Sequence, residues 1–204
     1  MTQLTIDNFK EMLRNALVRI KEREDEFSKL DAVIGDGDHG QAIVTAMTVV
    51  VATSEKGTEF KAMLNDLGFE LMLQVSGSTS TLIGAFFLGM SDATTGTELD
   101  ANGVKAMFAG GLKNVQKQTK AQPGDKTMMD ALVPAVEAME AAQTEDIKEI
   151  LTDAAKAAEA GALASVSMKA NFGRARNYGE RSIGYADSGA PSWACMFTSF
   201  AEVL

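Results

Sequence analysis

The chain has 204 residues, of which 46% are hydrophobic and 23% are charged. This length and composition predict a single globular domain over residues 1–204 and exclude a disordered chain. The 28 Asp and Glu residues outnumber the 19 Lys and Arg residues, which gives a formal net charge of −9. Binding to nucleic acid or to an anionic lipid surface is not expected, because both need a basic face.

The chain has one cysteine, Cys195, and one histidine, His39. A lone cysteine cannot form an internal disulfide, and the two residues cannot make a Cys/His zinc site. No apolar run approaches the roughly 18 residues that a membrane helix needs. The N-terminal residues also lack the apolar core of a secretory signal. We therefore expect a cytoplasmic protein with no membrane segment.

Apolar residues recur at helical spacing, in stripes or in longer apolar runs, along most of the chain. Helices are expected over 9–20, 41–54, 60–72, 80–92, 104–115, 128–139, 147–158 and 191–204. Asp7, Asp100 and Thr144 suit N-cap positions, and Pro191 suits the first position of a helix. No alternating strand pattern is visible. The sequence therefore predicts an all-α fold.

The connections between these helices differ in chemistry. In a bundle whose helices run up and down, alternate connections lie at the same end. One such set reads LDAVIGDGDHG, VSGSTST, AQPGDKT and KANFGRARNYGERSIGYADSGAP, whereas the other set has ordinary turn sequences. Each connection of the unusual set leads into a helix N-terminus, which offers free N–H groups to an anion such as phosphate. A binding site is therefore expected at that end.

Three acids, Asp31, Asp36 and Asp38, lie within eight residues of one another among several glycines. Glycine allows tight turns that point neighbouring carboxylates at one place. Hard oxygen ligands with positions left open for water and phosphate are typical of Mg²⁺ sites. The alternative is a Gly/Asp turn whose acids only cap the next helix.

Other residues in these connections suit a phosphate. The small and hydroxyl side chains of residues 76–81 favour a phosphate loop, although a flexible capping loop explains them too. Lys126, Arg174, Arg176 and Arg181 supply positive charge, with surface solvation as the alternative. His39 is expected to contact a phosphate or to be an exposed first-turn residue. It has no activating partner for a role as nucleophile.

The segments LDAVIGDGDHG, PGDKTMMD and GRARNYGERSIGYADSG resemble, in order and spacing, the nucleotide-binding L subunit of dihydroxyacetone kinases. The resemblance extends over essentially the whole chain. It implies an eight-helix up-and-down barrel that binds ADP or ATP and two Mg²⁺ ions at one end.

Carried over by position, the resemblance implies roles for individual residues. The magnesium ligands would be Asp31, Asp36 and Asp38. Arg174 and Lys126 would stabilise charge on the transferring phosphoryl group. The nucleotide would be contacted by His39, Gly40, Gln41, Ser78, Thr79, Ser80, Thr119, Met128, Arg174, Asp187, Ser188 and Gly189.

The resemblance also implies an enzyme that works with a partner. The chain would transfer a phosphoryl group to dihydroxyacetone, or a related small ketose, held by a separate ketose-binding K-type subunit. The donor would be bound ADP that a phosphocarrier of the phosphoenolpyruvate phosphotransferase system rephosphorylates, or ATP that exchanges. A role in glycerol metabolism follows, and a homodimer is also compatible.

Several positions depart from the family pattern. Ala42 and Thr45 stand where Asn and Arg are usual, residues 76–81 read SGSTST, Gln118-Thr119 replace an Arg-Gly pair, and Ser188 replaces a proline. These changes indicate a divergent member. They leave three alternatives open: a non-catalytic nucleotide-sensing adaptor, a magnesium-dependent phosphohydrolase, and a helical structural module.

Overall fold

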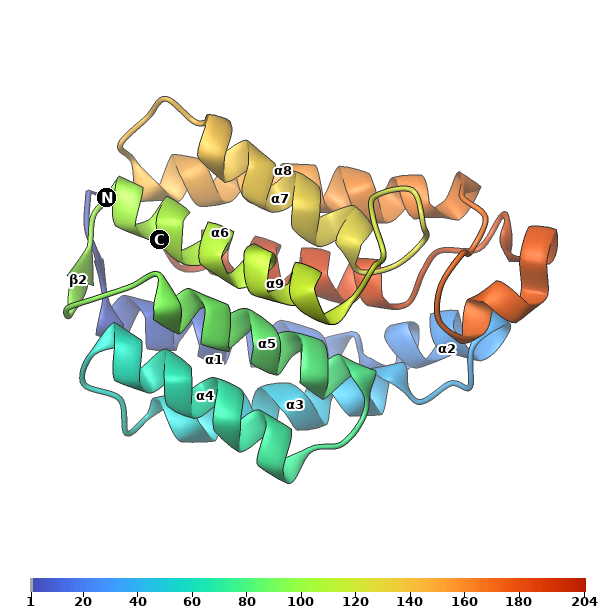
Figure 1. The fold of residues 1–204 in the computed structure, drawn as a ribbon, viewed down its shortest axis with the longest axis horizontal. Helices are drawn as coiled ribbons and strands as arrows, with labels where there is room; N and C mark the ends of the chain where they lie inside the picture. Colours follow the sequence, from blue (N-terminus) through green and yellow to red (C-terminus); the bar gives the residue numbers. More distant parts are fainter. Residues whose placement is uncertain (1) are drawn as a thin grey trace.

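The computed structural model describes residues 2–204 (Figure 1). Over these residues the chain forms nine α-helices, two 3-10 helices and one pair of two-residue strands. The α-helices are α1 (Ile6–Glu22), α2 (Glu24–Ile34), α3 (His39–Ser54), α4 (Phe60–Gln74), α5 (Ser78–Asp92), α6 (Ala101–Gln118), α7 (Met129–Ala141), α8 (Ile147–Ala164) and α9 (Gly189–Val203). The remaining elements are β1 (Leu4–Thr5), β2 (Glu98–Leu99), η1 (Ser165–Ser167) and η2 (Arg174–Ser182).

The long helices form a closed ring. α1 packs on α3, each helix from α3 to α8 packs on the next, and α9 returns to α1. Figure 1 shows these helices running along the long axis of the molecule, with η2 at one end and both termini at the other. Most successive helices are neighbours because their connections are short, so the up-and-down arrangement follows largely from the chain order. The all-α expectation is confirmed.

The apolar stripes of the helices face the inside of this ring. An aromatic cluster at its centre joins α5, α6 and α9: Trp193 lies edge-on to Phe86 with ring centroids 5.1 Å apart, and Phe86 lies 5.9 Å from Phe108. Burial of one such phenylalanine side chain contributes roughly 1.5–3 kcal/mol to stability. The cluster therefore anchors α9, whose first turn lies at the end where the unusual connections meet.

Two pairs of helices approach so closely that only glycine fits between them. A Cβ on Gly89 of α5 would lie 2.3 Å from the carbonyl oxygen of Gly110 on α6. A Cβ on Gly161 of α8 would lie 1.7 Å from the carbonyl oxygen of Asp130 on α7. These contacts fix the spacing of helices whose ends carry the loops described below.

The structure departs from the expected elements at several places. α2 was not expected, and it places Asp31 in a helix instead of a loop. Thr5 caps α1 in place of Asp7, and Asp146 caps α8 in place of Thr144. α9 begins at Gly189, so Pro191 is its third residue.

Other expectations hold, with one addition. The Asp100 side chain accepts the Gly103 N–H at 2.7 Å, as predicted for the N-cap of α6. The addition is the short antiparallel pair of β1 with β2, which joins the N-terminal residues to the α5–α6 connection. Within residues 2–204, none of the helices combines the length and apolar character needed to cross a membrane.

Candidate functional site

The four unusual connections meet at one end of the ring and line a cavity of about 480 Å³. Its walls come from the α2–α3, α4–α5, α6–α7 and α8–α9 connections. Four helices begin at residues that line it: α3 at His39, α5 at Ser78, α7 at Met129 and α9 at Gly189. Their free N–H groups and partial positive charge favour an anion in the cavity. The predicted gathering of these connections is confirmed.

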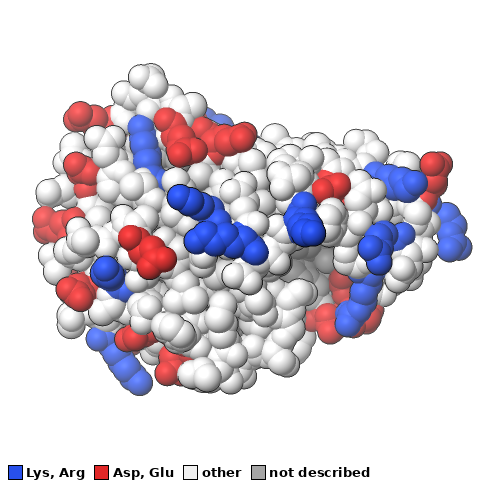
Figure 2. Space-filling model, in the orientation of Figure 1, with Lys and Arg blue, Asp and Glu red and all other residues white. Residues whose placement is uncertain are grey.

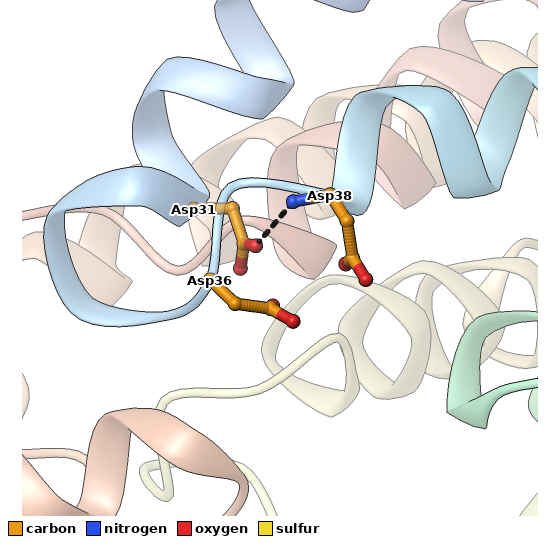
Figure 3. A group of neighbouring side chains, drawn as sticks. All are labelled: Asp31, Asp36 and Asp38. Carbon is orange, nitrogen blue, oxygen red and sulfur yellow. Dashed lines mark hydrogen bonds between the residues drawn. The ribbon is translucent and has the colours of Figure 1, made fainter.

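The three acids lie together on one wall of the cavity (Figure 3). Asp31 is in the last turn of α2, and Asp36 and Asp38 follow in the loop to α3. One carboxylate oxygen from each lies within 4.8 Å of the others. This set of hard oxygen donors, partly open to water, fits Mg²⁺ better than a soft metal.

Hydrogen bonds hold Asp31 in this arrangement. Its Oδ2 accepts the backbone N–H groups of Gly37 at 2.8 Å and of Asp38 at 3.2 Å, and its Oδ1 accepts the Ser188 hydroxyl at 3.0 Å. Gly37 has a φ of 82°, a left-handed conformation that glycine adopts without strain and that turns the loop back towards Asp31. Asp31 therefore orders the loop that carries the other two acids.

Arg174 contacts the carboxylate cluster from the α8–α9 connection. It is the first residue of η2, and its guanidinium forms an ion pair with Asp36 Oδ2. Both side chains are exposed, 65% for Arg174 and 39% for Asp36. Arg174 belongs to residues 165–188, which we call the lobe. Figure 2 shows several Lys and Arg side chains, with Asp and Glu among them, at the right-hand end of the molecule, where Figure 1 places both α2 and η2.

His39 joins three helices beside the acids. Its Nε2 lies 2.9 Å from the Ser192 hydroxyl, which itself donates to the Gly189 carbonyl, so Nε2 carries the proton. Its Nδ1 lies 3.4 Å from the Thr79 hydroxyl. Burial lowers the pKa of His39, against the opposing effect of Asp31 and Asp38. His39 thus ties α3 to α5 and α9, and it is not the exposed first-turn residue considered above.

Lys126 is buried and holds the lobe. Its Nζ donates to the carbonyl oxygens of Ser165 at 2.7 Å, of Met168 at 3.1 Å and of Tyr185. Burial lowers its pKa, against the opposing effect of Asp187 and Asp130. Its three N–H donors are all engaged, so none is left for a phosphate. Lys126 therefore positions the backbone of the lobe in this structure, and its expected catalytic role stays a prediction.

Asp187 and Asp130 hold the backbone on either side of Lys126. Asp187 Oδ2 accepts the Ala190 N–H at 2.6 Å, at the start of α9. Loss of water raises the pKa of Asp187 to about 7, and the nearby Asp130 acts in the same direction. Asp130 accepts the backbone N–H groups of Gly124 and Thr127 at 2.5 and 2.8 Å, which shapes the α6–α7 loop.

Most of the predicted site residues line the cavity. They are Asp31, Asp36, Asp38, His39, Ser78, Thr79, Thr119, Lys126, Met128, Arg174, Asp187, Ser188 and Gly189.

Three predicted residues do not line the cavity. Gly40 packs α3 on α2, where a Cβ would lie 2.1 Å from the Glu24 carbonyl oxygen. Gln41 points to solvent and contacts Thr45 at 3.2 Å. Ser80 is buried and donates to the carbonyls of Val75 and Gly77. Gly40 and Ser80 each follow a lining residue, His39 and Thr79, and the next positions on a helix turn away from the cavity.

The sequence analysis missed the apolar part of the wall. Leu82, Phe172 and Trp193 line the cavity together with the predicted Met128. Phe172 had a detectable signal, because it is a large aromatic residue within a polar glycine-rich loop. Trp193 had none, because it also belongs to the apolar stripe of α9. These side chains make one side of the cavity suitable for a planar apolar group.

Comparison with known proteins identifies relatives of this chain. The model of the DAK2 domain family matches residues 33–202. The ADP-binding subunit DhaL of PEP-dependent dihydroxyacetone kinase 1 from Listeria innocua is 34% identical over 186 residues, covering 90% of this chain and 89% of the relative. The corresponding DhaL subunit from Escherichia coli is 36% identical over 179 residues, covering 84% of each chain.

A solved structure has the same fold. The dihydroxyacetone kinase of C. freundii, in complex with AMP-PNP and Mg²⁺, superposes with a TM-score of 0.74 at 24% identity. The match covers 95% of this chain but 33% of the longer kinase chain. The family model spans most of the sequence, and the DhaL relatives match along most of their length. The chain therefore belongs to the DAK2 domain family.

Proposed function

We propose that this chain is the ADP- or ATP-binding subunit of a kinase that phosphorylates dihydroxyacetone or a related small ketose. The observation that carries the proposal is the cavity in which four helix N-termini face three clustered carboxylates. Helix N-termini bind phosphate, and clustered carboxylates bind the Mg²⁺ that accompanies it. The relatives are ADP-binding subunits of dihydroxyacetone kinases, which supports the same reading.

Asp31, Asp36 and Asp38 would hold magnesium, and we expect two ions as in the family pattern. Magnesium neutralises and bridges phosphate oxygens when it is bound. Ser78 and Thr79 offer hydroxyl and backbone N–H groups to the phosphates at the start of α5. Arg174 would stabilise the negative charge on the transferring phosphoryl group. The base would lie against Met128 and Phe172 on the apolar side.

The ketose that accepts the phosphoryl group is expected to be held by another subunit. Among the residues that line the cavity, His39 is already engaged with Ser192 and Thr79. We propose that a ketose-binding K-type subunit covers the mouth of the cavity. Two phosphoryl donors are possible: bound ADP that a phosphocarrier rephosphorylates in place, or ATP that exchanges. The similarity to PEP-dependent relatives favours the first. A single domain over residues 1–204, a cytoplasmic location and a homodimer remain parts of this proposal.

The test is to denature the purified protein, quantify released nucleotide and magnesium, and measure thermal stabilisation by Mg·ADP. A ligand at 100 times its Kd adds about 2.7 kcal/mol to the free energy of unfolding. We expect this stabilisation in the wild type and in Asp66→Asn, an exposed acid on α4. It should be lost in Asp36→Asn and Asp38→Asn.

The alternatives give different results. An absence of nucleotide together with no stabilisation by Mg·ADP or Mg·ATP would reject the kinase proposal. Phosphate release by this chain alone would favour the phosphohydrolase. Nucleotide binding without transfer, even when the ketose-binding subunit is supplied, would favour the adaptor.

A further inference from the structure

The cavity wall contains one cation that is free to change partners. Of the Lys and Arg residues that line the cavity in the described chain, Lys126 has its three N–H donors engaged by backbone carbonyls. The other is Arg174, whose guanidinium pairs with Asp36. Asp36 is also a member of the carboxylate cluster. The same carboxylate is therefore offered to a guanidinium and to a metal ion.

We propose that Arg174 competes with the divalent cation for Asp36, and that nucleotide phosphates relieve this competition by drawing Arg174 away. The proposal rests on the metal site of the proposed function and adds its regulation. Metal alone would bind weakly, and metal and nucleotide would each strengthen the binding of the other.

The charges explain the competition. The three carboxylates supply three negative charges, and a guanidinium on Asp36 removes one of them and repels a second cation nearby. Planar guanidinium groups form paired, charge-assisted hydrogen bonds with phosphate. A bound polyphosphate would thus offer Arg174 an equivalent partner and leave Asp36 to the metal.

The geometry makes the exchange easy. Arg174 is 65% exposed, and an exposed ion pair contributes little to stability. Arg174 follows Gly173, which has a φ of 63°, and η2 is interrupted at Gly179, which has a φ of 56°. The segment that carries Arg174 is therefore bounded by two glycines, while Lys126 holds the backbone of the lobe elsewhere.

The coupling must act in both directions. If nucleotide raises the affinity for metal by a given factor, metal raises the affinity for nucleotide by the same factor. Removal of the guanidinium should therefore strengthen metal binding in the absence of nucleotide. It should also reduce the gain in metal affinity that the nucleotide produces. A residue that only stabilised the fold would not produce these opposite effects.

The experiment measures binding of Mn²⁺ to the full chain, stripped of nucleotide, by the loss of the free-ion EPR signal, with and without ADP. Arg174→Gln removes the competing charge. Arg176→Gln is the matched control, because Arg176 is an exposed arginine of the same 3-10 helix that does not line the cavity. Arg174→Lys retains a positive charge at the same place.

Without ADP, we expect Arg174→Gln to bind Mn²⁺ about two- to fivefold more tightly than the wild type, given the small contribution of exposed ion pairs. Arg176→Gln and Arg174→Lys should stay close to the wild type. The increase in affinity on addition of ADP should be smaller in Arg174→Gln.

Unchanged or weaker Mn²⁺ binding in Arg174→Gln would overturn the proposal, as would an equal gain in Arg176→Gln. Asp36→Asn separates this failure from failure of the proposed function. If Asp36→Asn weakens Mn²⁺ binding and Arg174→Gln has no effect, only the competition is wrong. If the wild type and Asp36→Asn bind equally, or neither binds, the metal site and the competition are both rejected.

Discussion

Lys126 and Asp130 show that several charged residues around the cavity hold backbone groups in place. Lys126 binds three carbonyls of the lobe, and Asp130 binds two N–H groups of the α6–α7 loop. Lys126 also has a φ of 60°, the one positive φ of a non-glycine residue among those described. A conformation this unfavourable persists only where the surroundings enforce it. The three carbonyl contacts provide that enforcement.

Replacement of Lys126 by Met should destabilise the protein. The change leaves the carbonyls of Ser165, Met168 and Tyr185 without this donor, so we expect the free energy of unfolding to fall by about 2–3 kcal/mol. Chemical denaturation measures the change. Lys120→Met, at an exposed position of the same loop, is the control and should leave stability nearly unchanged. Equal stability of the two variants would contradict the assigned role.

At this scale the sequence predicted residue types better than side-chain directions. The acids at 31, 36 and 38 stood out as a group because they lie within eight residues of one another among glycines, although a helix-capping turn explained the same pattern. The sequence identified Lys126 as a source of positive charge in the loop. Its burial, however, depends on carbonyl groups about 40 to 60 positions further along the chain. No local pattern contains that information.

Among the elements, α2 has the largest effect on the site. It follows α1 after a single residue, Arg23, and its buried apolar side chains are Phe27 and Ile34. Two buried positions make no continuous stripe, which is why periodicity did not predict this helix. Its last turn carries Asp31. The carbonyl oxygen of its first residue, Glu24, lies directly against Gly40 of α3. The carboxylate cluster therefore depends on a helix that only tertiary packing reveals.

The contact of α8 with α7 gives a prediction at the same scale. Gly161→Ala would place a Cβ 1.7 Å from the Asp130 carbonyl oxygen and force the helices apart. Alanine favours helix by about 1 kcal/mol over glycine, but we expect a net loss of about 1–3 kcal/mol from overpacking. Thermal unfolding measures this loss.

Gly103→Ala is the matched control. A Cβ there would find its nearest neighbours, side-chain atoms of Asp100 and Leu99, at 3.3 Å, so its melting temperature should fall much less than that of Gly161→Ala. A stabilised Gly161→Ala would show that helix propensity outweighs the contact, and would contradict the packing described here.

For the whole molecule, the ring of helices was predictable and the lobe was not. Short connections between amphipathic helices leave few arrangements other than neighbours in sequence order. The lobe lacks apolar periodicity, and its position is fixed by polar contacts with distant residues. Residues 165–188 carry a net charge of +2, whereas the rest of the chain carries −11. This opposite charge favours association of the lobe with the rest of the chain.

Asp187 makes the stability of the molecule depend on pH. Its pKa is about 7 in the folded protein and 3.8 as a free side chain, so folding favours the protonated carboxyl. This contribution is complete below about pH 4 and is lost as the pH rises through 7. Asp187→Asn keeps an acceptor for the Ala190 N–H but cannot ionise. We therefore expect the melting temperature of the variant, relative to the wild type, to rise between pH 5 and pH 8.

Thermal unfolding of both proteins across this pH range provides the measurement. A constant difference in melting temperature would show that Asp187 has the same pKa in the folded and unfolded chain.

The two termini lie together at the end of the ring opposite the lobe (Figure 1). A linker attached to either terminus would leave from that far end, so a covalently joined domain would not have to pass over the cavity. The same fold can therefore serve as a free-standing subunit or as one segment of a longer polypeptide. The C. freundii kinase, of which this chain matches 33%, is an example of the second form. Gene fusion and gene separation would then be interchangeable without any redesign of the end that carries the cavity.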